Sequence, residues 1–267
     1  MAVCGAAGRM GRALVQVIAA DPQAQLSAAV EYSGHPMLGQ DAGVVAGAAF
    51  QGVSLCADLQ RELLLELQVM IDFSLPEPAL QHARWASDTL TPLVIGTTGF
   101  TELQRLELLE IARTIPVVIS GNYSVGVNIA LDLVRRATLA FGAEYDVELV
   151  EAHHRHKIDA PSGTALMLAE TVAEARNEKL ATVMRCGRES SNVRAAGEIG
   201  IHSVRGGDVV GEHQVWFIGE GERLEIRHVA TSRLNFAQGA VRAAHWLVSQ
   251  SAGMYSMRHV LGLDPLS

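Results

Sequence analysis

Three histidines and a lysine lie within five residues of one another: His153, His154, His156 and Lys157. Residues 147–150, directly before this group, alternate apolar and acidic side chains and predict a half-buried strand. The basic side chains are therefore expected at the end of a strand. Imidazole and ammonium groups can donate protons and contact anions near neutral pH.

A helix is predicted directly downstream. Pro161 and Ser162 precede an apolar run, and Ser162 is a suitable N-cap. The first N–H groups of a helix have no partner inside the helix and carry partial positive charge, so they suit a carboxylate or phosphate. The stretch 151–165 therefore predicts a site for an anionic substrate that must be protonated.

Two other interpretations of the histidines were weighed. A single histidine at a strand end is usually a surface residue, but four basic side chains beside a helix start favour function. For a metal site, His154 and His156 would share one face of a strand and His153 the other. No cysteine lies nearby, and Arg155 and Lys157 would repel a cation. We expect no metal.

Composition limits the class of protein. The 267 residues are 49% hydrophobic and 19% charged, which is typical of an α/β protein with a sizeable core. The net charge of −8 argues against nucleic-acid binding. No apolar run is long enough to predict a membrane span. The three cysteines are far apart and no targeting segment precedes Gly5, so we expect reduced thiols and a cytoplasmic protein.

A glycine motif follows the apolar residues 1–4. Gly5, Gly8 and Gly11 lie between this short predicted strand and a predicted helix, which is the context of a dinucleotide-binding turn. Ala7 stands where the second glycine of the usual motif is expected, so the motif alone is equally compatible with a tight turn. Glu31 ends the next predicted strand, twenty residues after Gly11, where an acid would bind ribose hydroxyls.

Strands and helices then alternate, which predicts a parallel sheet. Strands are expected at 26–30, 69–73, 92–95 and 116–119, and helices at 58–67, 76–85 and 102–113. Residues 33–52 are expected to form a loop. Because ligands bind beyond the carboxyl ends of parallel strands, the small-residue turns at 96–98 and 120–123 are candidate cofactor contacts, although ordinary turns are as good an interpretation.

The pattern changes after a predicted helix at 125–140. Strands are expected at 146–153, 199–204, 209–218 and 223–230, with a helix at 162–175. Turns at 205–208 and 219–221 predict hairpins. The fold class is therefore α/β, with an N-terminal Rossmann-like parallel sheet and a central α+β domain with an open mixed or antiparallel sheet. We expect residues 1–124 to be completed by a helix at 235–248 in the segment 234–267, and 125–233 to form the second domain.

Four motifs together resemble dihydrodipicolinate reductases, the 4-hydroxy-tetrahydrodipicolinate reductases of bacterial lysine and diaminopimelate synthesis: residues 5–10, 96–100, 122–128 and 151–165. The similarity runs in order along the chain without a large insertion, and the last motif is the most specific. The resemblance implies hydride transfer from NADH or NADPH to a cyclic dicarboxylate with loss of water. It also implies a dinucleotide-binding domain and a central domain that binds substrate and builds a homotetramer.

The resemblance also implies residue roles. His153 matches the catalytic histidine and Lys157 the proton donor, and substrate carboxylates would contact His154, Gly163 and Thr164. The implied cofactor contacts are Gly5, Ala6, Ala7, Gly8, Arg9, Met10, Glu31, Gly96, Thr97, Thr98, Ser120, Gly121, Asn122 and Tyr123.

One position departs from the pattern of some family members. Tyr32 follows Glu31 where those members carry an arginine suited to the 2′-phosphate of NADPH. We therefore expect NADH to be preferred and NADPH tolerated. Two alternatives remain open from the sequence: a reductase of another small dicarboxylate, and a non-catalytic redox sensor that binds a dinucleotide.

Overall fold

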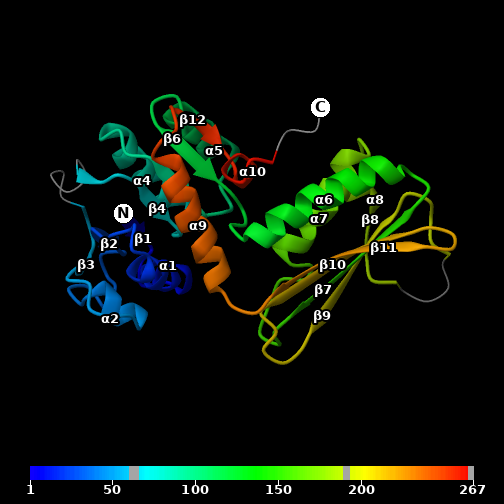
Figure 1. Ribbon diagram of the computed structural model, residues 1–267, viewed down its shortest axis with the longest axis horizontal. Helices are drawn as coiled ribbons and strands as arrows, with labels where there is room; N and C mark the ends of the chain where they lie inside the picture. Colours follow the sequence, from blue (N-terminus) through cyan, green and yellow to red (C-terminus); the bar gives the residue numbers. More distant parts are fainter. Residues whose placement is uncertain (60–65, 189–192, 264–267) are drawn as a thin grey trace. The chain divides into compact units, whose positions relative to one another are not determined.

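The computed structural model describes residues 1–59, 66–188 and 193–263, and it divides into two compact units (Figure 1). The first unit comprises Met1–Val125 and Arg233–Ser267, and the second comprises Gly126–Ser232. The helix predicted at 58–67 falls mostly on residues 60–65, which lie outside the described residues. In the described part of the chain, no helix combines the length and apolar character that a membrane span requires.

The first unit is built on a seven-stranded sheet of order β12-β6-β5-β4-β1-β2-β3, and every strand pair in it is parallel. Its strands are β1 (Ala2–Cys4), β2 (Ala28–Val30), β3 (Leu55–Cys56), β4 (Met70–Asp72), β5 (Leu93–Ile95), β6 (Pro116–Ile119) and β12 (Gly253–Tyr255). The chain runs outward from β1 to β3 and then in the other direction from β4 to β6. The strand order therefore reverses beside β1, where open α/β sheets bind ligands. The predicted parallel sheet is confirmed.

Helices cover both faces of this sheet (Figure 1). One face packs on α1 (Arg9–Ala20), α2 (Ala42–Ala46), α9 (Leu234–Leu247) and α10 (Met257–Val260), and the other on α4 (Pro76–Asp88) and α5 (Glu102–Ile111). Side chains alternate accordingly, since Val3 and Ile71 join the first core and Cys4 and Met70 the second. Burial on both faces explains why these strands are short, almost wholly apolar runs.

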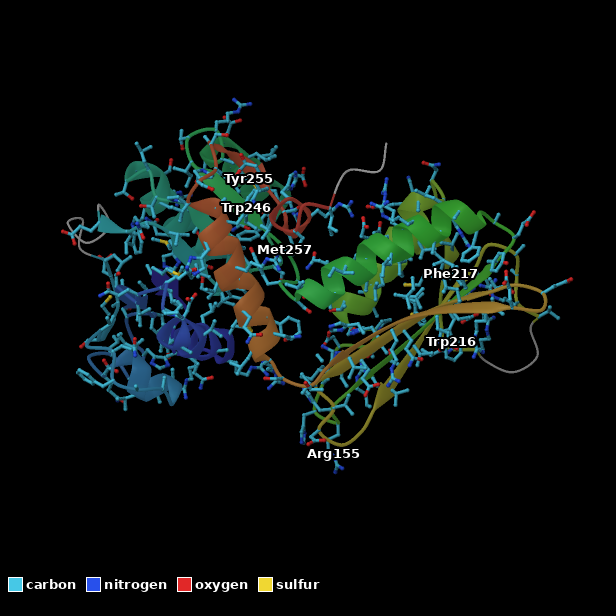
Figure 2. All side chains as sticks on the ribbon, in the orientation of Figure 1. Arg155, Trp216, Phe217, Trp246, Tyr255 and Met257 are labelled. Carbon is cyan, nitrogen blue, oxygen red and sulfur yellow. The ribbon has the colours of Figure 1, made fainter. Side chains whose placement is uncertain are left out.

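The predicted C-terminal helix is α9, and it belongs to this first unit. Gly239 lets α9 approach the sheet, because a Cβ there would lie 1.8 Å from the carbonyl oxygen of Tyr123. Trp246 of α9 meets Tyr255 of β12 edge to face, with ring centroids 5.2 Å apart (Figure 2). This contact attaches the short β12 and α10, which were absent from the sequence prediction.

The second unit has a five-stranded sheet of order β11-β10-β7-β9-β8. Its elements are α6 (Val125–Phe141), β7 (Asp146–His153), α7 (Gly163–Ala175), α8 (Leu180–Val183), β8 (Met184–Cys186), β9 (Ile199–Arg205), β10 (Gly211–Ile218) and β11 (Arg223–Ala230). β10 pairs antiparallel with β7 and β11, whereas β9 pairs parallel with β7 and β8, so the sheet is mixed. Phe217 on one face packs in a core with α6 and α7, while Trp216 on the opposite face is partly exposed.

One predicted hairpin is wrong. β9 and β10 do not pair with each other, because β7 lies between them. The turn at 205–208 instead crosses the end of β7, where Gly206 N donates to His153 O at 3.0 Å and His154 N donates to Val209 O at 2.7 Å. The predicted hairpin at 219–221 is confirmed, since it joins the antiparallel strands β10 and β11.

Other local predictions also need correction. The segment 33–52 is not a continuous loop, because it contains α2, which Asp41 caps by accepting a hydrogen bond from Val44 N. β2 begins at Ala28, and α4 continues to Asp88. β7 ends at His153, so His154 and His156 do not lie on one face of a strand. These errors reflect element ends and a helix of one turn, which hydrophobic periodicity resolves poorly.

Candidate active site

A buried carboxylate lies at the centre of the predicted histidine site in the second unit. Glu151 is 1% exposed, and both of its oxygens accept hydrogen bonds. Arg205 binds it through two nitrogens, at 2.8 and 2.7 Å. His153 Nδ1 lies 2.6 Å from Oε2, and Ser162 N donates to Oε1 at 3.2 Å. Burial alone would raise the pKa of Glu151, but hydrogen bonds from Arg205, Ser203 and His153 outweigh burial and lower it to about 2.

This arrangement fixes one nitrogen of His153. With Nδ1 donating to the ionised Glu151, Nε2 is left for another partner. Burial lowers the pKa of His153, and the contact with Glu151 opposes part of that shift. A Cβ on Gly211 would lie 3.1 Å from Nε2, so glycine at this position keeps the nitrogen uncovered. His153 can therefore exchange a proton or a hydrogen bond through Nε2.

His213 of β10 lies against His153, with ring centroids 5.2 Å apart. Its Nε2 is 3.0 Å from Ser162 Oγ, which also accepts from Ala165 N and caps α7 as predicted. Burial, with a contribution from His153, lowers the pKa of His213 to about 4. His213 is therefore neutral at neutral pH. The sequence interpretation missed His213 and Arg205, because only the pairing of β7 with β10 and β9 brings them to Glu151.

Lys157 lies in the loop between β7 and α7. Its Nζ is 2.8 Å from Asp159 Oδ1, which lowers the pKa of Asp159. Lys157 N donates to His154 O at 3.1 Å, so the loop folds back on itself. Gly163 and Thr164 are the first residues of α7, and a Cβ on Gly163 would meet nothing within 4 Å. The space beside the Cα of Gly163 is therefore open, at the start of the helix that follows the loop carrying Lys157.

Three of the predicted cofactor residues of the first unit, Gly5, Gly8 and Glu31, line one cavity beside the end of β1. A cavity of about 380 Å³ is lined by Gly5, Gly8, Val30, Glu31, Tyr32, Ala57, Phe73, Ser74, Leu75, Pro78, Gln81 and His82. A groove of about 530 Å³ between α1 and α9 contains none of the predicted site residues. The smaller cavity is the better candidate, because it lies where the strand order reverses.

The glycine turn packs closely against neighbouring backbone. Gly5 has φ +75°, and a Cβ there would lie 2.7 Å from Phe73 O. Gly11 packs closer still, since its Cβ would lie 2.0 Å from Gly5 O. No described side chain caps the start of α1, which leaves its first N–H groups available for phosphate. Glu31 accepts a hydrogen bond from Ala7 N at 3.0 Å, so its carboxylate is held at the cavity rim.

The other predicted contacts are placed differently. Tyr123 is 1% exposed, and its hydroxyl donates to the carbonyls of Ile95 and Val118. Its side chain therefore belongs to the core, and only its backbone could contact a ligand. Ser120 Oγ donates to Asn122 O, which stabilises the turn at 120–123. Thr97 is also buried, and its hydroxyl donates to Asp72 at 2.7 Å.

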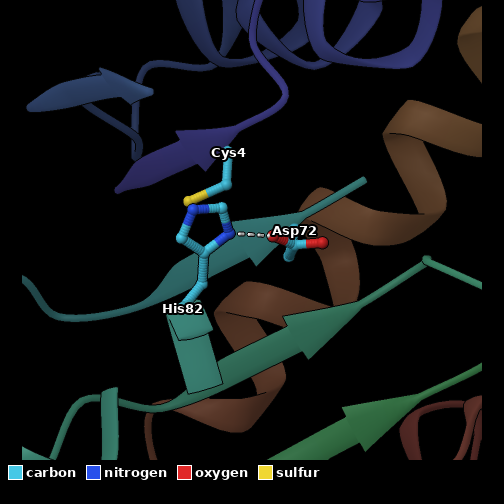
Figure 3. A group of neighbouring side chains, drawn as sticks. All are labelled: Cys4, Asp72 and His82. Carbon is cyan, nitrogen blue, oxygen red and sulfur yellow. Dashed lines mark hydrogen bonds and ion pairs between the residues drawn. The ribbon is translucent and has the colours of Figure 1, made fainter. Parts of the chain in front are cut away.

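Asp72 belongs to a second buried group, with Cys4 and His82, whose metal-ligand atoms lie within 4.8 Å of one another (Figure 3). The carboxylate of Asp72 already accepts hydrogen bonds from Ser74 and Thr97 and lies 2.5 Å from His82 Nδ1. Burial, with repulsion from Asp72, raises the pKa of the Cys4 thiol well above its usual value, so the sulfur stays protonated. The group acts as a hydrogen-bonding centre between β4, α4 and the turn after β5.

Family models and known relatives match almost the whole chain. The N-terminal model of dihydrodipicolinate reductase matches residues 1–123, and the C-terminal model matches residues 126–261. The 4-hydroxy-tetrahydrodipicolinate reductase of Psychrobacter arcticus is 49% identical, over 98% of this chain and 94% of that relative. The enzyme of the same name from Magnetococcus marinus is 47% identical, over 97% of both chains.

A solved structure extends the comparison to three dimensions. The dipicolinate-bound dihydrodipicolinate reductase of Paenisporosarcina sp. TG-14 has a TM-score of 0.76 and 25% identity, and 96% of each chain is covered. Two matched family models thus span almost the whole chain, and both units have counterparts in a solved relative. The chain belongs to the dihydrodipicolinate reductase family.

Proposed function

We propose that this protein reduces 4-hydroxy-tetrahydrodipicolinate to tetrahydrodipicolinate with loss of water, using a nicotinamide dinucleotide as hydride donor, in diaminopimelate and lysine synthesis. The observation that carries the proposal is that His153 and Ser162, the N-cap of α7, both bind Glu151, with Lys157 in the loop between them. The family models match the chain along almost its whole length.

Lys157 is the proposed proton donor. The dinucleotide supplies a hydride when bound, and the reduced carbon skeleton then needs a proton. Lys157 can supply this proton. Its Nζ forms one ion pair among the described residues, with the side chain of Asp159. His153 presents Nε2 as a hydrogen-bonding or proton-exchanging group, because Glu151 holds Nδ1.

The substrate carboxylates are assigned to the start of α7 and to His154. Gly163 and Thr164 offer helix N–H groups, and the partial positive charge of this helix end favours anions. His154 directly follows β7, and its backbone is fixed by the hydrogen bond to Val209 O. These contacts would orient the dicarboxylate without requiring a metal.

The cofactor contacts are assigned to the glycine turn (residues 5–10), Glu31, and the turns at 96–98 and 120–123. The close packing of Gly5 and Gly11 against neighbouring backbone supports the assignment of the glycine turn. The position of Glu31 in the cavity lining supports its assignment. Tyr32 is 62% exposed and offers no positive charge. Arg12 is engaged with Ala7 O and Met37. We therefore propose that NADH is preferred over NADPH, and a lower KM for NADPH would contradict this.

We also propose a cytoplasmic homotetramer that binds no nucleic acid. The first unit would bind the dinucleotide, and the second would bind substrate and form the subunit contacts. The partly exposed sheet face that carries Trp216 supports this assignment, because a partly exposed aromatic ring on a sheet face favours further burial by a partner. The free cysteines agree with a reducing compartment.

A coupled assay tests the reaction. The hydroxylated substrate is generated in situ, and the absorbance of NADH and of NADPH is followed separately. We expect oxidation that depends on the substrate, fails in Lys157→Ala combined with His153→Ala, and is faster with NADH at low concentration. Tight dinucleotide binding without turnover would leave the fold standing and refute the substrate.

A further inference from the structure

We propose that Arg205 and Glu151 are positioning residues that set the proton affinity of His153 and hold the loop that carries Lys157. The inference rests on the proposed function, and it concerns two side chains that neither the motif nor the family match assigns a role. Both come from strands of the second unit that are adjacent in the sheet, β7 and β9.

Arg205 and Glu151 form a buried bidentate pair. Arg205 binds Glu151 in the two-nitrogen, two-oxygen arrangement, at 2.8 and 2.7 Å, and the carboxylate is 1% exposed. A planar guanidinium in this geometry fixes the carboxylate plane as well as neutralising its charge. The same carboxylate accepts from His153 Nδ1, so the orientation of the imidazole follows from that of Arg205.

Arg205 also binds the loop that carries Lys157. Its Nη2 also donates to Asp159 O at 2.7 Å, two residues beyond Lys157. The turn that follows Arg205 holds the other end of the loop, because Arg155 N donates to Gly207 O at 3.2 Å. Ser162 N, at the far end of the loop, donates to Glu151. The loop between β7 and α7 is thus tied at its start, middle and end to the Arg205–Glu151 pair and its turn.

The charges around His153 oppose one another. The groups that face His153 are Glu151 on β7, Arg205 on β9, His213 on β10 and Lys157 in the loop. Glu151 alone among these favours the protonated imidazole, whereas Arg205 and Lys157 disfavour it and His213 is neutral at pH 7. Burial is the largest influence and lowers the pKa of His153, the contact with Glu151 opposes it, and Arg205 adds a smaller lowering contribution. Because Arg205 offsets part of the charge of Glu151, the buried carboxylate does not lock His153 as an imidazolium.

Two variants test the proposal in the full-length protein. Glu151→Gln keeps the shape and removes the charge. The pKa of His153, followed by NMR of histidine-labelled protein, is expected to fall by about one unit. The limb of the kcat profile that follows His153 should move to lower pH by the same amount. Arg205→Lys keeps the charge but cannot make both contacts, so kcat should fall about tenfold or more while KM for the dinucleotide stays within twofold.

Arg136→Lys is the matched control, because Arg136 pairs with Asp132 on α6 at 2.8 Å and lies outside the loop contacts. Circular dichroism verifies that each variant is folded, and Arg205→Lys alone decides the matter if Glu151→Gln does not fold. An unchanged His153 pKa, or an unchanged kcat in folded Arg205→Lys, overturns the proposal. The NMR titration needs no substrate, so its result is independent of the coupled assay. If the wild type shows no turnover in that assay, only the proposed function is refuted.

Discussion

Each unit of this protein buries a carboxylate beside the Nδ1 atom of a histidine, but the two carboxylates are neutralised differently. Asp72 in the first unit is bound by the hydroxyls of Ser74 and Thr97 and by His82. Glu151 in the second unit is bound by His153 and, through two nitrogens, by Arg205. Among the residues that the structure describes, a permanent cation accompanies only the second of these carboxylates.

This difference has a consequence for function. A carboxylate without a fixed cation depends on its histidine for any compensating charge, so that histidine is a structural partner. A carboxylate that already has an arginine leaves its histidine able to gain or lose a proton at small cost to the fold. His82 is therefore expected to stabilise the first unit, whereas His153 is available for proton transfer. Four predictions test this contrast.

The largest effect is expected from Arg205→Ala. It leaves Glu151 buried without its cation, which should lower the free energy of unfolding by about 3–5 kcal/mol at pH 7, measured by urea denaturation. Arg84→Ala is the control, because Arg84 binds Glu107 through two nitrogens as well, but both side chains are substantially exposed. That variant should lose much less stability, because solvent screens an exposed ion pair. Equal losses would mean that burial does not decide the strength of the pair.

The same pair predicts how wild-type stability depends on pH. The folded pKa of Glu151 is about 2, below its usual value of 4.5. Its contribution, on the order of 3 kcal/mol, is therefore complete above pH 4.5 and is lost as the pH falls toward 2. Urea denaturation between pH 6 and 2 should show this loss in the wild type and much less of it in Glu151→Gln. An identical acid dependence in the two proteins would contradict the assignment.

The contrast between the histidines is sharper when both are removed in parallel. His82→Ala should lower the free energy of unfolding by about 1–2 kcal/mol more than His153→Ala, because Asp72 keeps only neutral donors while Glu151 keeps Arg205. The double variant Asp72→Asn with His82→Ala should recover part of the loss, as a double-mutant cycle would reveal. Losses of the same size at the two sites would refute the distinction.

The contacts of Asp72 with His82 and of Glu151 with Arg205 differ in how well the sequence predicts them. Ser162 as the cap of α7, the parallel sheet and the glycine turn follow from local patterns, since hydrophobic period and capping chemistry act over a few residues. Asp72 and His82 are ten residues apart, within a single strand-to-helix unit. Arg205 and Glu151 are 54 residues apart. Their contact depends on β9 lying parallel to β7, and the sequence had predicted a hairpin with β10 instead.

The partners of Glu151 and His153 come from other strands, so no local pattern indicates them. Glu151 lies inside the stretch 151–165. Its role could not be predicted, because nothing local indicates that an arginine from another strand binds it. His213 faces Glu151 directly across the β7–β10 pair, and only the register of that pair brings it there. A local pattern can therefore locate a catalytic loop, but the residues that tune its pKa values come from strand order, which depends on long-range packing.

The smallest expected effect on stability comes from blocking access to His153 Nε2. This change separates the chemical role of His153 from its structural role. Gly211→Ala would put a methyl group 3.1 Å from Nε2, without touching Glu151 or Arg205. We expect kcat to fall about tenfold while the free energy of unfolding changes by less than about 1 kcal/mol. Gly206→Ala is the control, since a Cβ there meets nothing within 4 Å. If Gly211→Ala retains full activity, Nε2 does not act on the substrate, and His153 would resemble His82 in serving only its carboxylate.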